Sequence, residues 1–185
     1  MSTLQFPTAL PSLTGTLVHL RELGEQDIEP WFERATDAES ADLAGDSVPA
    51  SISLGAAWLQ RHRDSFSKRL GLRWAIVPSG ALASVGTIGL TLKPSEGQWA
   101  ELGVVVARAW WNKGLASEAA RLVTRYAFEE VRMHEIRAQV LERNHPSIRL
   151  LEKAGFHLVR ALPPSTAEPE AMLLYALSRR CLSAA

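Results

Sequence analysis

The sequence predicts a mixed α/β fold in one domain. Short segments in which apolar and polar residues alternate predict strands, and segments in which apolar residues recur every three or four positions predict helices. The two kinds of segment interleave along the chain, which is typical of the α/β classes. With 185 residues, 46% of them hydrophobic, the chain has enough apolar surface for one core but not for two. We therefore expect residues 1–14 to be irregular and exposed, and residues 15–185 to form a single domain.

The first half of the chain predicts a strand, two helices and three further strands. Apolar side chains after Asp27 share one helical stripe, and so do those after Ser53. The last three segments are separated by turns that contain Pro, Ser and Gly, so we expect antiparallel neighbours. In chain order we expect a strand at residues 16–21, a helix from Asp27, a helix at 53–69 and strands at 72–77, 84–93 and 99–107.

The strand at residues 99–107 is predicted to lie at the centre of the sheet. Its residues 102–106 are apolar with almost no alternation, which is typical of a strand covered on both faces. A helix and another strand follow it, and strands connected in this way are expected to pair in parallel.

The second half of the chain predicts two helices and three strands. Pro146 is tolerated in a first helical turn, and Gly155 suits the left-handed position after a last turn. Residues 162–170 are rich in Pro, Ser and Glu, and we expect them to be irregular and exposed. In order we expect a helix of about four turns from Leu115, a strand at 136–141, a short helix from Pro146 to Gly155, and strands at 156–160 and 171–178.

The composition excludes several classes of function. Lys and Arg number 20, and Asp and Glu also number 20, so there is no net positive charge to favour a nucleic acid. Cys181 is the single cysteine, which excludes an intrachain disulfide and the thiolate zinc patterns, and we expect no metal. No apolar run approaches the roughly 18 residues of a membrane span. We therefore expect a cytoplasmic protein that binds neither nucleic acid nor membrane.

Residues 101–118 predict a buried strand, a tight turn and a helix. The first turn of a helix presents unpaired amides at the positive end of the helix dipole, which suits a diphosphate. Gly114 and the small Ala116 let a ligand approach the backbone, and Lys113 adds a positive charge. An ordinary strand-to-helix turn explains the segment equally well. The dinucleotide fingerprint and the P-loop pattern are both absent.

A second motif, Asn144-His-Pro-Ser-Ile-Arg-Leu-Leu-Glu-Lys-Ala-Gly-Phe156, resembles a pattern of the GNAT superfamily of N-acetyltransferases. The pattern has an Asn after the fifth strand and a short helix that ends in Gly-Phe. Together with the turn at residues 111–116, the chain is similar to the branch that contains the ribosomal-protein alanine N-acetyltransferases. The resemblance covers residues 16–178. It implies the acyl-CoA N-acyltransferase fold, a central mixed sheet of about seven strands with about four flanking helices.

Two residues depart from the family pattern. Trp111 stands where Gln or Arg is usual in the superfamily, which is common in this branch. Leu151 stands where many members have a catalytic Tyr, so the usual general acid is missing. Similarity to the branch offers Ser147 as its substitute.

The resemblance implies a set of site residues. An amine would attack the acetyl thioester directly, with Glu101 as the base, Ser147 as a hydrogen-bond donor to the leaving thiolate and Asn144 bound to the cofactor arm or the acetyl carbonyl. Each also has a simpler explanation: a surface Glu at a strand end, a first-turn Ser and a turn Asn. The residues expected to bind acetyl-CoA are Val104, Val105, Val106, Trp111, Asn112, Lys113, Gly114, Leu115, Ala116, Ser117 and Asn144.

The acceptor is predicted less sharply. We expect a primary amine, such as the α-amino group of a peptide N-terminus, with the chain acting as a monomer or homodimer. If they converge, acidic residues in two loops would favour a cationic acceptor, such as a basic protein N-terminus, a polyamine or an aminoglycoside, although a solvated acidic surface is the simpler explanation. Because Leu151 replaces the usual acid, a catalytically idle acyl-CoA-binding regulatory domain is a further alternative, as is a purely structural module. The acidic residues are Asp37, Glu39, Asp42 and Asp46 in the first loop and Glu168 and Glu170 in the second.

Overall fold

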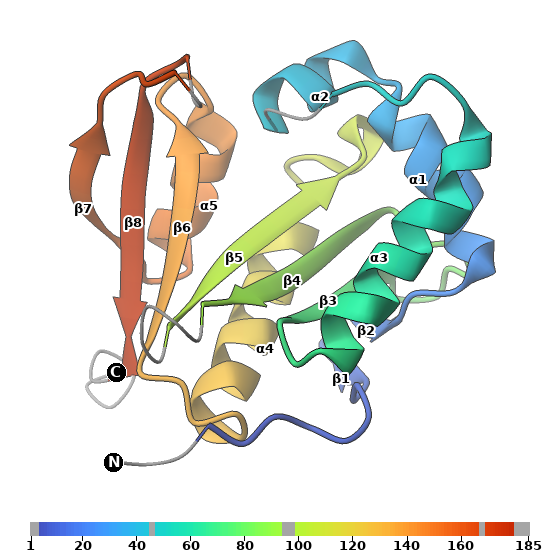
Figure 1. Cartoon of the computed structure of the whole chain (residues 1–185), viewed down its shortest axis with the longest axis horizontal. Helices are drawn as coiled ribbons and strands as arrows, with labels where there is room; N and C mark the ends of the chain where they lie inside the picture. Colours follow the sequence, from blue (N-terminus) through green and yellow to red (C-terminus); the bar gives the residue numbers. More distant parts are fainter. Residues whose placement is uncertain (1–3, 45–46, 94–98, 167–168, 180–185) are drawn as a thin grey trace.

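The computed structural model describes residues 4–44, 47–93, 99–166 and 169–179. These residues form one sheet of eight strands in the order β1-β2-β3-β4-β5-β6-β8-β7, with helices on its two faces (Figure 1). The strands are β1 (Leu13–Thr14), β2 (Val18–Glu22), β3 (Gly71–Pro78), β4 (Gly86–Leu92), β5 (Trp99–Val106), β6 (Glu135–Leu141), β7 (His157–Leu162) and β8 (Met172–Ser178). The α-helices are α1 (Ile28–Ala35), α2 (Ala38–Ala44), α3 (Gly55–Ser67), α4 (Leu115–Glu129) and α5 (His145–Lys153).

The predicted elements are present, with two additions. The meander β3-β4-β5 is antiparallel and β5 pairs with β6 in parallel, as expected. The additional strand is β1, which is too short to show alternation. The additional helix, α2, lies in the acidic segment that we expected to be a loop. Its start is marked by Asp37, whose carboxylate accepts a hydrogen bond from the Ser40 amide at 2.9 Å.

The central strands diverge, and this divergence creates the site. β5 and β6 pair only where Trp99, Ala100 and Glu101 face residues 135–137. Beyond Glu101 the two strands separate, and Figure 1 shows the V between them. The expectation that β5 is covered on both faces therefore holds only in part: Leu102 and Val106 are buried, whereas Val104 and Val105 are partly exposed beside this opening.

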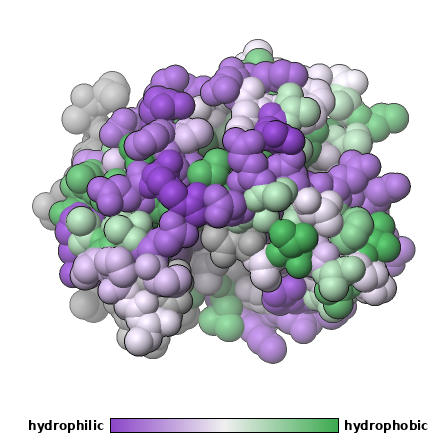
Figure 2. Space-filling view, turned by 90° about the horizontal axis from the view of Figure 1, so that it is seen from above, coloured by the Kyte–Doolittle hydropathy of each residue, from purple (hydrophilic) through white to green (hydrophobic). Residues whose placement is uncertain are grey.

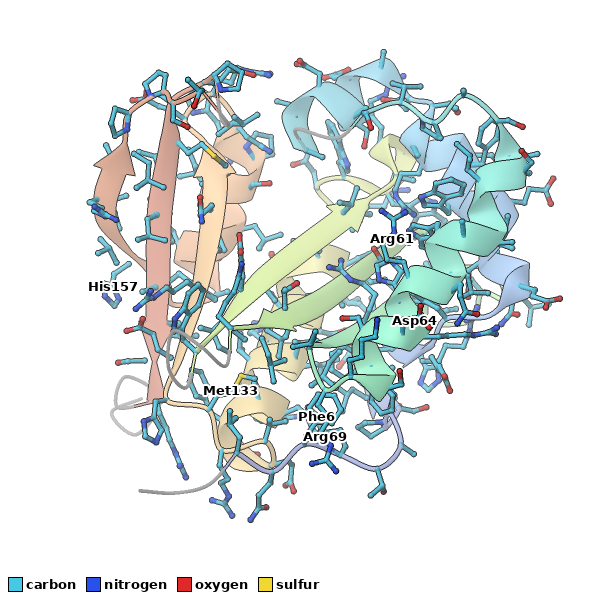
Figure 3. All side chains as sticks on the ribbon, viewed as in Figure 1. Phe6, Arg61, Asp64, Arg69, Met133 and His157 are labelled. Atoms are coloured by element: carbon cyan, nitrogen blue, oxygen red, sulfur yellow. The ribbon has the colours of Figure 1, made fainter. Side chains whose placement is uncertain are left out.

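The core lies between the sheet and α4. Ala119, Val123 and Ala127 have no exposed surface and form the stripe of α4 that faces the strands. The N-terminal segment is irregular from Leu4 to Ser12, but Leu13 and Thr14 form β1, and the segment is not simply exposed. The side chain of Phe6 contacts that of Phe66 with ring centroids 5.2 Å apart (Figure 3), and other apolar residues of the segment also pack on the core. No helix in the described part of the chain is both long and apolar enough to cross a membrane.

The start of α4 is joined to the sheet by one carboxylate. Glu118 accepts hydrogen bonds from the amides of Thr16, Leu17 and Val18 at 3.0, 2.7 and 2.9 Å. These bonds connect the first turn of α4 to the turn that precedes β2. The position of the loop before α4 therefore depends on this contact.

We expect Glu118→Gln to lower the free energy of unfolding by about 2 kcal/mol, because its amide group cannot accept all three hydrogen bonds. Urea denaturation measures the change. Glu129→Gln, at the exposed other end of α4, is the matched control and should change stability by less than about 0.5 kcal/mol. Equal effects of the two substitutions would contradict a special role for Glu118.

Candidate active site

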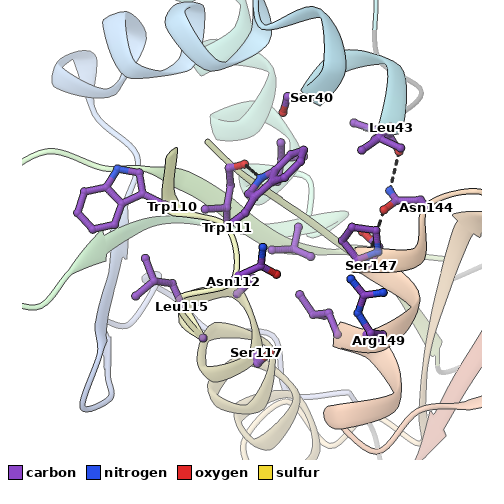
Figure 4. A pocket seen from close by; sticks show the side chains of 18 of the residues that line it. Ser40, Leu43, Trp110, Trp111, Asn112, Leu115, Ser117, Asn144, Ser147 and Arg149 are labelled. Atoms are coloured by element: carbon purple, nitrogen blue, oxygen red, sulfur yellow. Dashed lines mark hydrogen bonds between the residues drawn. The ribbon is translucent and has the colours of Figure 1, made fainter. Parts of the chain in front are cut away.

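A cavity of about 450 Å³ lies at the open end of the V (Figure 4). Its walls are the end of β5, the loop and first turn of α4, the start of α5 and one side of α2. Two predicted site residues, Glu101 and Lys113, do not line it. The predicted residues that do are Val104, Val105, Val106, Trp111, Asn112, Gly114, Leu115, Ala116, Ser117, Asn144 and Ser147.

The loop before α4 presents a run of main-chain amides. Asn112 and Gly114 have positive φ angles of 59° and 80°, which turns successive N–H groups toward one side. The first amide bonded within α4 is that of Glu118, which donates to the Gly114 carbonyl at 3.0 Å. Within the described residues, the amides of residues 112–117 donate to no protein acceptor. Such a run fits an anion with several oxygens, such as a diphosphate.

Trp111 fixes this loop to the end of β5. Its indole Nε1 donates to the Val106 carbonyl at 2.6 Å (Figure 4), which gives a structural role to the residue that departs from the family pattern. Lys113 is exposed instead of facing the cavity, because its ammonium lies 4.6 Å from the centroid of the Trp110 ring.

The open edge of β5 carries further free main-chain groups. The Ala107 amide donates to the Val85 carbonyl at 2.7 Å, and hydrogen-bonded pairs alternate along an antiparallel ladder. Ile88 and Val104 therefore form a non-hydrogen-bonded pair, in which the main-chain groups of Val104 point away from β4. Val104 thus directs its N–H and C=O into the gap beside β6, where an extended ligand can pair with them as a strand would.

Asn144 holds α2 and α5 together at the mouth of the cavity. It is the N-cap of α5, and its side-chain oxygen accepts from the Ser147 amide at 3.2 Å. Its side-chain nitrogen donates to the Leu43 carbonyl at 2.7 Å, so the predicted ligand-binding amide is largely occupied by the protein (Figure 4). The Ser147 hydroxyl faces the cavity and makes no hydrogen bond to the described residues.

Sequence reasoning missed the contributions of α2 and of the exposed face of α5. Arg149 and Lys153, one helical turn apart, add two positive charges to the cavity wall. That spacing was a usable signal, since both residues follow the recognised Asn144. No signal pointed to Ser40, Leu43 and Ala44 of α2, because their place depends on contacts over about a hundred residues.

Glu101 lies at the closed end of the V. It is the last β5 residue that pairs with β6, opposite Arg137, and it also faces Thr91 of β4. The nearest charged neighbours on β6, Arg137 and Glu135, are paired with each other at 2.5 Å. The partly exposed Glu101 side chain is thus placed at the closed end of the V and does not line the cavity.

One arginine links α2 to the segment before β8 by two ion pairs. Arg143 binds Asp42 of α2 at 2.5 Å and Glu170 of the segment before β8 at 2.6 Å. The hydrogen bond from Arg143 holds the pKa of Glu170 below its usual value. Figure 2 looks onto this end of the molecule, and hydrophilic residues gather over it.

A second arginine pairs with the two other described acidic residues of this region, one just before α2 and one in it. Arg108 lies 2.8 Å from Asp37 and 3.1 Å from Glu39. Asp46 and Glu168 lie outside the described residues. Each of the four acidic side chains that the structure describes is thus paired with an arginine, but two arginines against four carboxylates leave a net negative charge, so the cationic acceptor stays a prediction.

A smaller cavity of about 200 Å³ lies on the other face of the central strands, under α3. Arg61, His62 and Ser65 of α3 and Arg73 of β3 line it. Burial, and then the charges of Arg73 and Arg61, lower the pKa of His62 from 6.5 to about 4. His62 is therefore neutral at pH 7 and a weak base.

The pKa of His62 predicts a loss of stability in mild acid. The unfolded chain takes up a proton at His62 near pH 6.5, whereas the folded chain resists it until about pH 4. The contribution of neutral His62 to the free energy of unfolding is thus fully present above pH 6.5 and is lost as the pH falls toward 4. Between pH 7 and pH 5 the loss should be about 2 kcal/mol, and it should be absent in His62→Gln. Urea denaturation at both pH values tests this, and an equal pH dependence of the two proteins would refute it.

The fold and the cavity define a class of protein. A splayed pair of central strands, with free main-chain groups on β5 and a run of free amides before α4, is the architecture of an acyl-CoA-dependent acyltransferase. The chain belongs to the GNAT acetyltransferases: the family model described as "Acetyltransferase (GNAT) domain" matches residues 18–157. It is an acetyl-CoA-dependent N-acetyltransferase, and it transfers an acetyl group to an amine.

Known proteins support this assignment. The uncharacterized N-acetyltransferase YoaA of Bacillus subtilis is 30% identical over 146 residues, which are 79% of this chain and 82% of YoaA. A GNAT-family acetyltransferase from Bacillus anthracis has the same fold, with a TM-score of 0.81 at 22% identity over 92% of this chain and 99% of its own. The spermidine N-acetyltransferase of Vibrio cholerae, solved with CoA and spermine, gives 0.77 at 15% identity over 90% and 98% of the two chains.

Proposed function

We propose that this chain transfers the acetyl group of acetyl-CoA to a primary amine by direct attack in a ternary complex, and that the amine is an α-amino group. The observation that carries the proposal is the run of free amides at residues 112–117, which opens onto the same cavity as the free edge of β5. One extended ligand with a diphosphate at one end and a thioester at the other fits both features.

The parts of acetyl-CoA can be assigned to parts of the cavity. The diphosphate would accept hydrogen bonds from the amides around Gly114. The pantetheine arm would pair with the open edge of β5 at Val104. Arg149 and Lys153 are the described cations of the cavity wall, and they would neutralise phosphate charge. The thioester would then lie toward the closed end of the V, near Glu101.

The reaction needs a neutral amine and a stabilised oxyanion. Nitrogen attacks the thioester carbon, the carbonyl oxygen becomes an oxyanion, and collapse of this intermediate expels the thiolate of CoA. An α-amino group has a pKa of about 8, so Glu101 acting through a water molecule suffices to take its proton, whereas a Lys side chain near 10.4 needs more help. Ser147 would donate a hydrogen bond to the departing sulfur.

Acetyl-CoA binding and thiol release together test the proposal. Purified protein is heated with and without acetyl-CoA, and thiol release is then followed with peptides of differing first residue, free amino acids and polyamines. We expect thermal stabilisation by acetyl-CoA and turnover with α-amines. Stabilisation with no turnover would instead establish the idle binding domain that Leu151 suggests, and no stabilisation would refute both functions.

Ser147→Ala separates the catalytic explanation from the structural one. Because Asn144 caps α5 and the Ser147 hydroxyl has no partner in the described part of the chain, removing it should leave the unfolding free energy within about 0.5 kcal/mol. We expect kcat to fall about tenfold with little change in the KM for acetyl-CoA. Steady-state kinetics and urea denaturation measure the two effects. An unchanged kcat would leave Ser147 with no role in the reaction.

A further inference from the structure

The smaller cavity under α3 is lined by α3, β3 and β4, and β4 is the sheet neighbour of β5, whose end lines the acetyl-CoA cavity. Gly103 lies on the face of β5 that is turned toward α3, and its neighbour Val104 lines the acetyl-CoA cavity. Beyond Glu101 no strand pairing closes the space between β5 and β6. A ligand that extends from the α3 side to the thioester would pass through this open part of the V.

Two facing glycines let Arg73 lie across this part of the sheet. Gly89 and Gly103 are cross-strand partners, and Gly89 also faces Arg73 in the register of β3 and β4. A Cβ on Gly89 would lie 2.7 Å from Arg73 Nε, and one on Gly103 would lie 3.5 Å from Nη2. The guanidinium reaches the Gly103 carbonyl, to which Nη1 donates at 3.4 Å. The charge of a β3 residue is thereby carried over β4 to β5.

Arg61 adds a second positive charge from α3, the helix that covers this face of the sheet. It lines the same cavity as Arg73, on the flank of α3 that is turned toward the central strands (Figure 3). Burial, and then the charges of Arg73 and Arg61, lower the pKa of His62, which lines the same cavity. The hydroxyl-bearing residues Ser65 and Thr91 complete the polar lining.

We propose that Arg61 and Arg73 bind an anionic group of the acceptor, which is then a primary amine with a carboxylate or phosphate a few bonds from its nitrogen. The site rests on the proposed acetyl transfer, since it would position that acceptor. Arg73 is level with Gly103 across the sheet, and Thr91 is level with Glu101. On β5 these two positions are two residues apart, which is about 7 Å along the strand. A short molecule can therefore place its anion at the arginines and its amine beside Glu101.

The first experiment compares matched acceptors. Thiol release is measured for peptides that begin with Asp or Asn, for alanine and alaninamide, and for phosphoethanolamine and ethanolamine. We expect kcat/KM to be at least tenfold higher for the anionic member of a pair, and this ratio to approach one in Arg61→Gln and Arg73→Gln. Comparing ratios between wild type and variants cancels differences in amine pKa. Carboxylate and phosphate pairs separate the two kinds of anion, and a ratio that is the same in wild type and variants would overturn the proposal.

The second experiment needs no turnover. Inorganic phosphate is titrated into the CoA-saturated protein while the ring resonances of His62 are followed by NMR. A saturable shift that disappears in Arg61→Gln and Arg73→Gln supports the site, and unchanged acetyl-CoA binding shows that the variants are folded. The absence of a shift would overturn the anion site, whether or not amines are acetylated. A shift without turnover of any amine would instead refute the proposed function and the acceptor role with it.

Discussion

Gly114→Val should weaken acetyl-CoA binding at least a hundredfold and abolish the thermal stabilisation by acetyl-CoA. Gly114 has a φ of 80°, a conformation that a β-branched residue adopts only at a cost of about 1–2 kcal/mol. A Cβ there would also lie 3.3 Å from the Leu17 side chain. If the loop relaxes to a negative φ, the amides around it turn away from the diphosphate. Isothermal titration calorimetry with acetyl-CoA measures the loss.

The chain offers a matched control for this substitution. Gly80, in the turn between β3 and β4, has a φ of 81°, and a Cβ added there would have no atom of the described residues within 4 Å. Gly80→Val therefore introduces the same backbone strain far from the cavity. It should lower the stability of the protein by a similar amount and leave the Kd for acetyl-CoA unchanged. A Kd for Gly114→Val within threefold of wild type would show that the diphosphate binds elsewhere.

The sequence was sufficient where the chemistry is local. The turn at residues 111–117 belongs to one strand, one loop and one helix, so its glycine, its small residues and its place at a helix start could be identified from neighbouring residues. The structure brings these predicted residues to one cavity, with the exception of Lys113. Lys113 differs because a flexible side chain can choose an aromatic ring next to it, and no spacing rule predicts that choice.

The parts of the site that could not be predicted depend on distant pairs. Six acidic residues suggested a cationic acceptor, but no local pattern predicted that Asp42 pairs with Arg143, which is 101 positions away. The side chain of Arg73 likewise reaches from β3 over β4 to β5, and only the register that places Gly89 and Gly103 beneath it explains how. A sequence gives the number of charged residues. The electrostatic potential at a ligand site also depends on which of those residues form ion pairs with each other in the fold.

Glu101→Gln should lower kcat by about 10²–10³ while the Kd for acetyl-CoA stays unchanged. The substitution keeps the size of the side chain and removes its ability to take a proton from the amine. Because the acetyl-CoA cavity is not lined by Glu101, cofactor binding should not be affected. Steady-state kinetics over a pH range provides a second measurement. The rate of the variant should rise more steeply at high pH than that of wild type, where the amine loses its proton without help.

A neighbouring carboxylate provides the control for this test. Glu135 lies on β6, opposite Trp99, two residues from the line of Glu101, and is paired with Arg137. Glu135→Gln removes a charge from the same region without touching the proposed base, so kcat should stay within threefold of wild type. If kcat falls equally in the two variants, the rate depends on the local negative charge and Glu101 does not act as a base. An unchanged kcat in Glu101→Gln would show that the amine loses its proton to another group or directly to water.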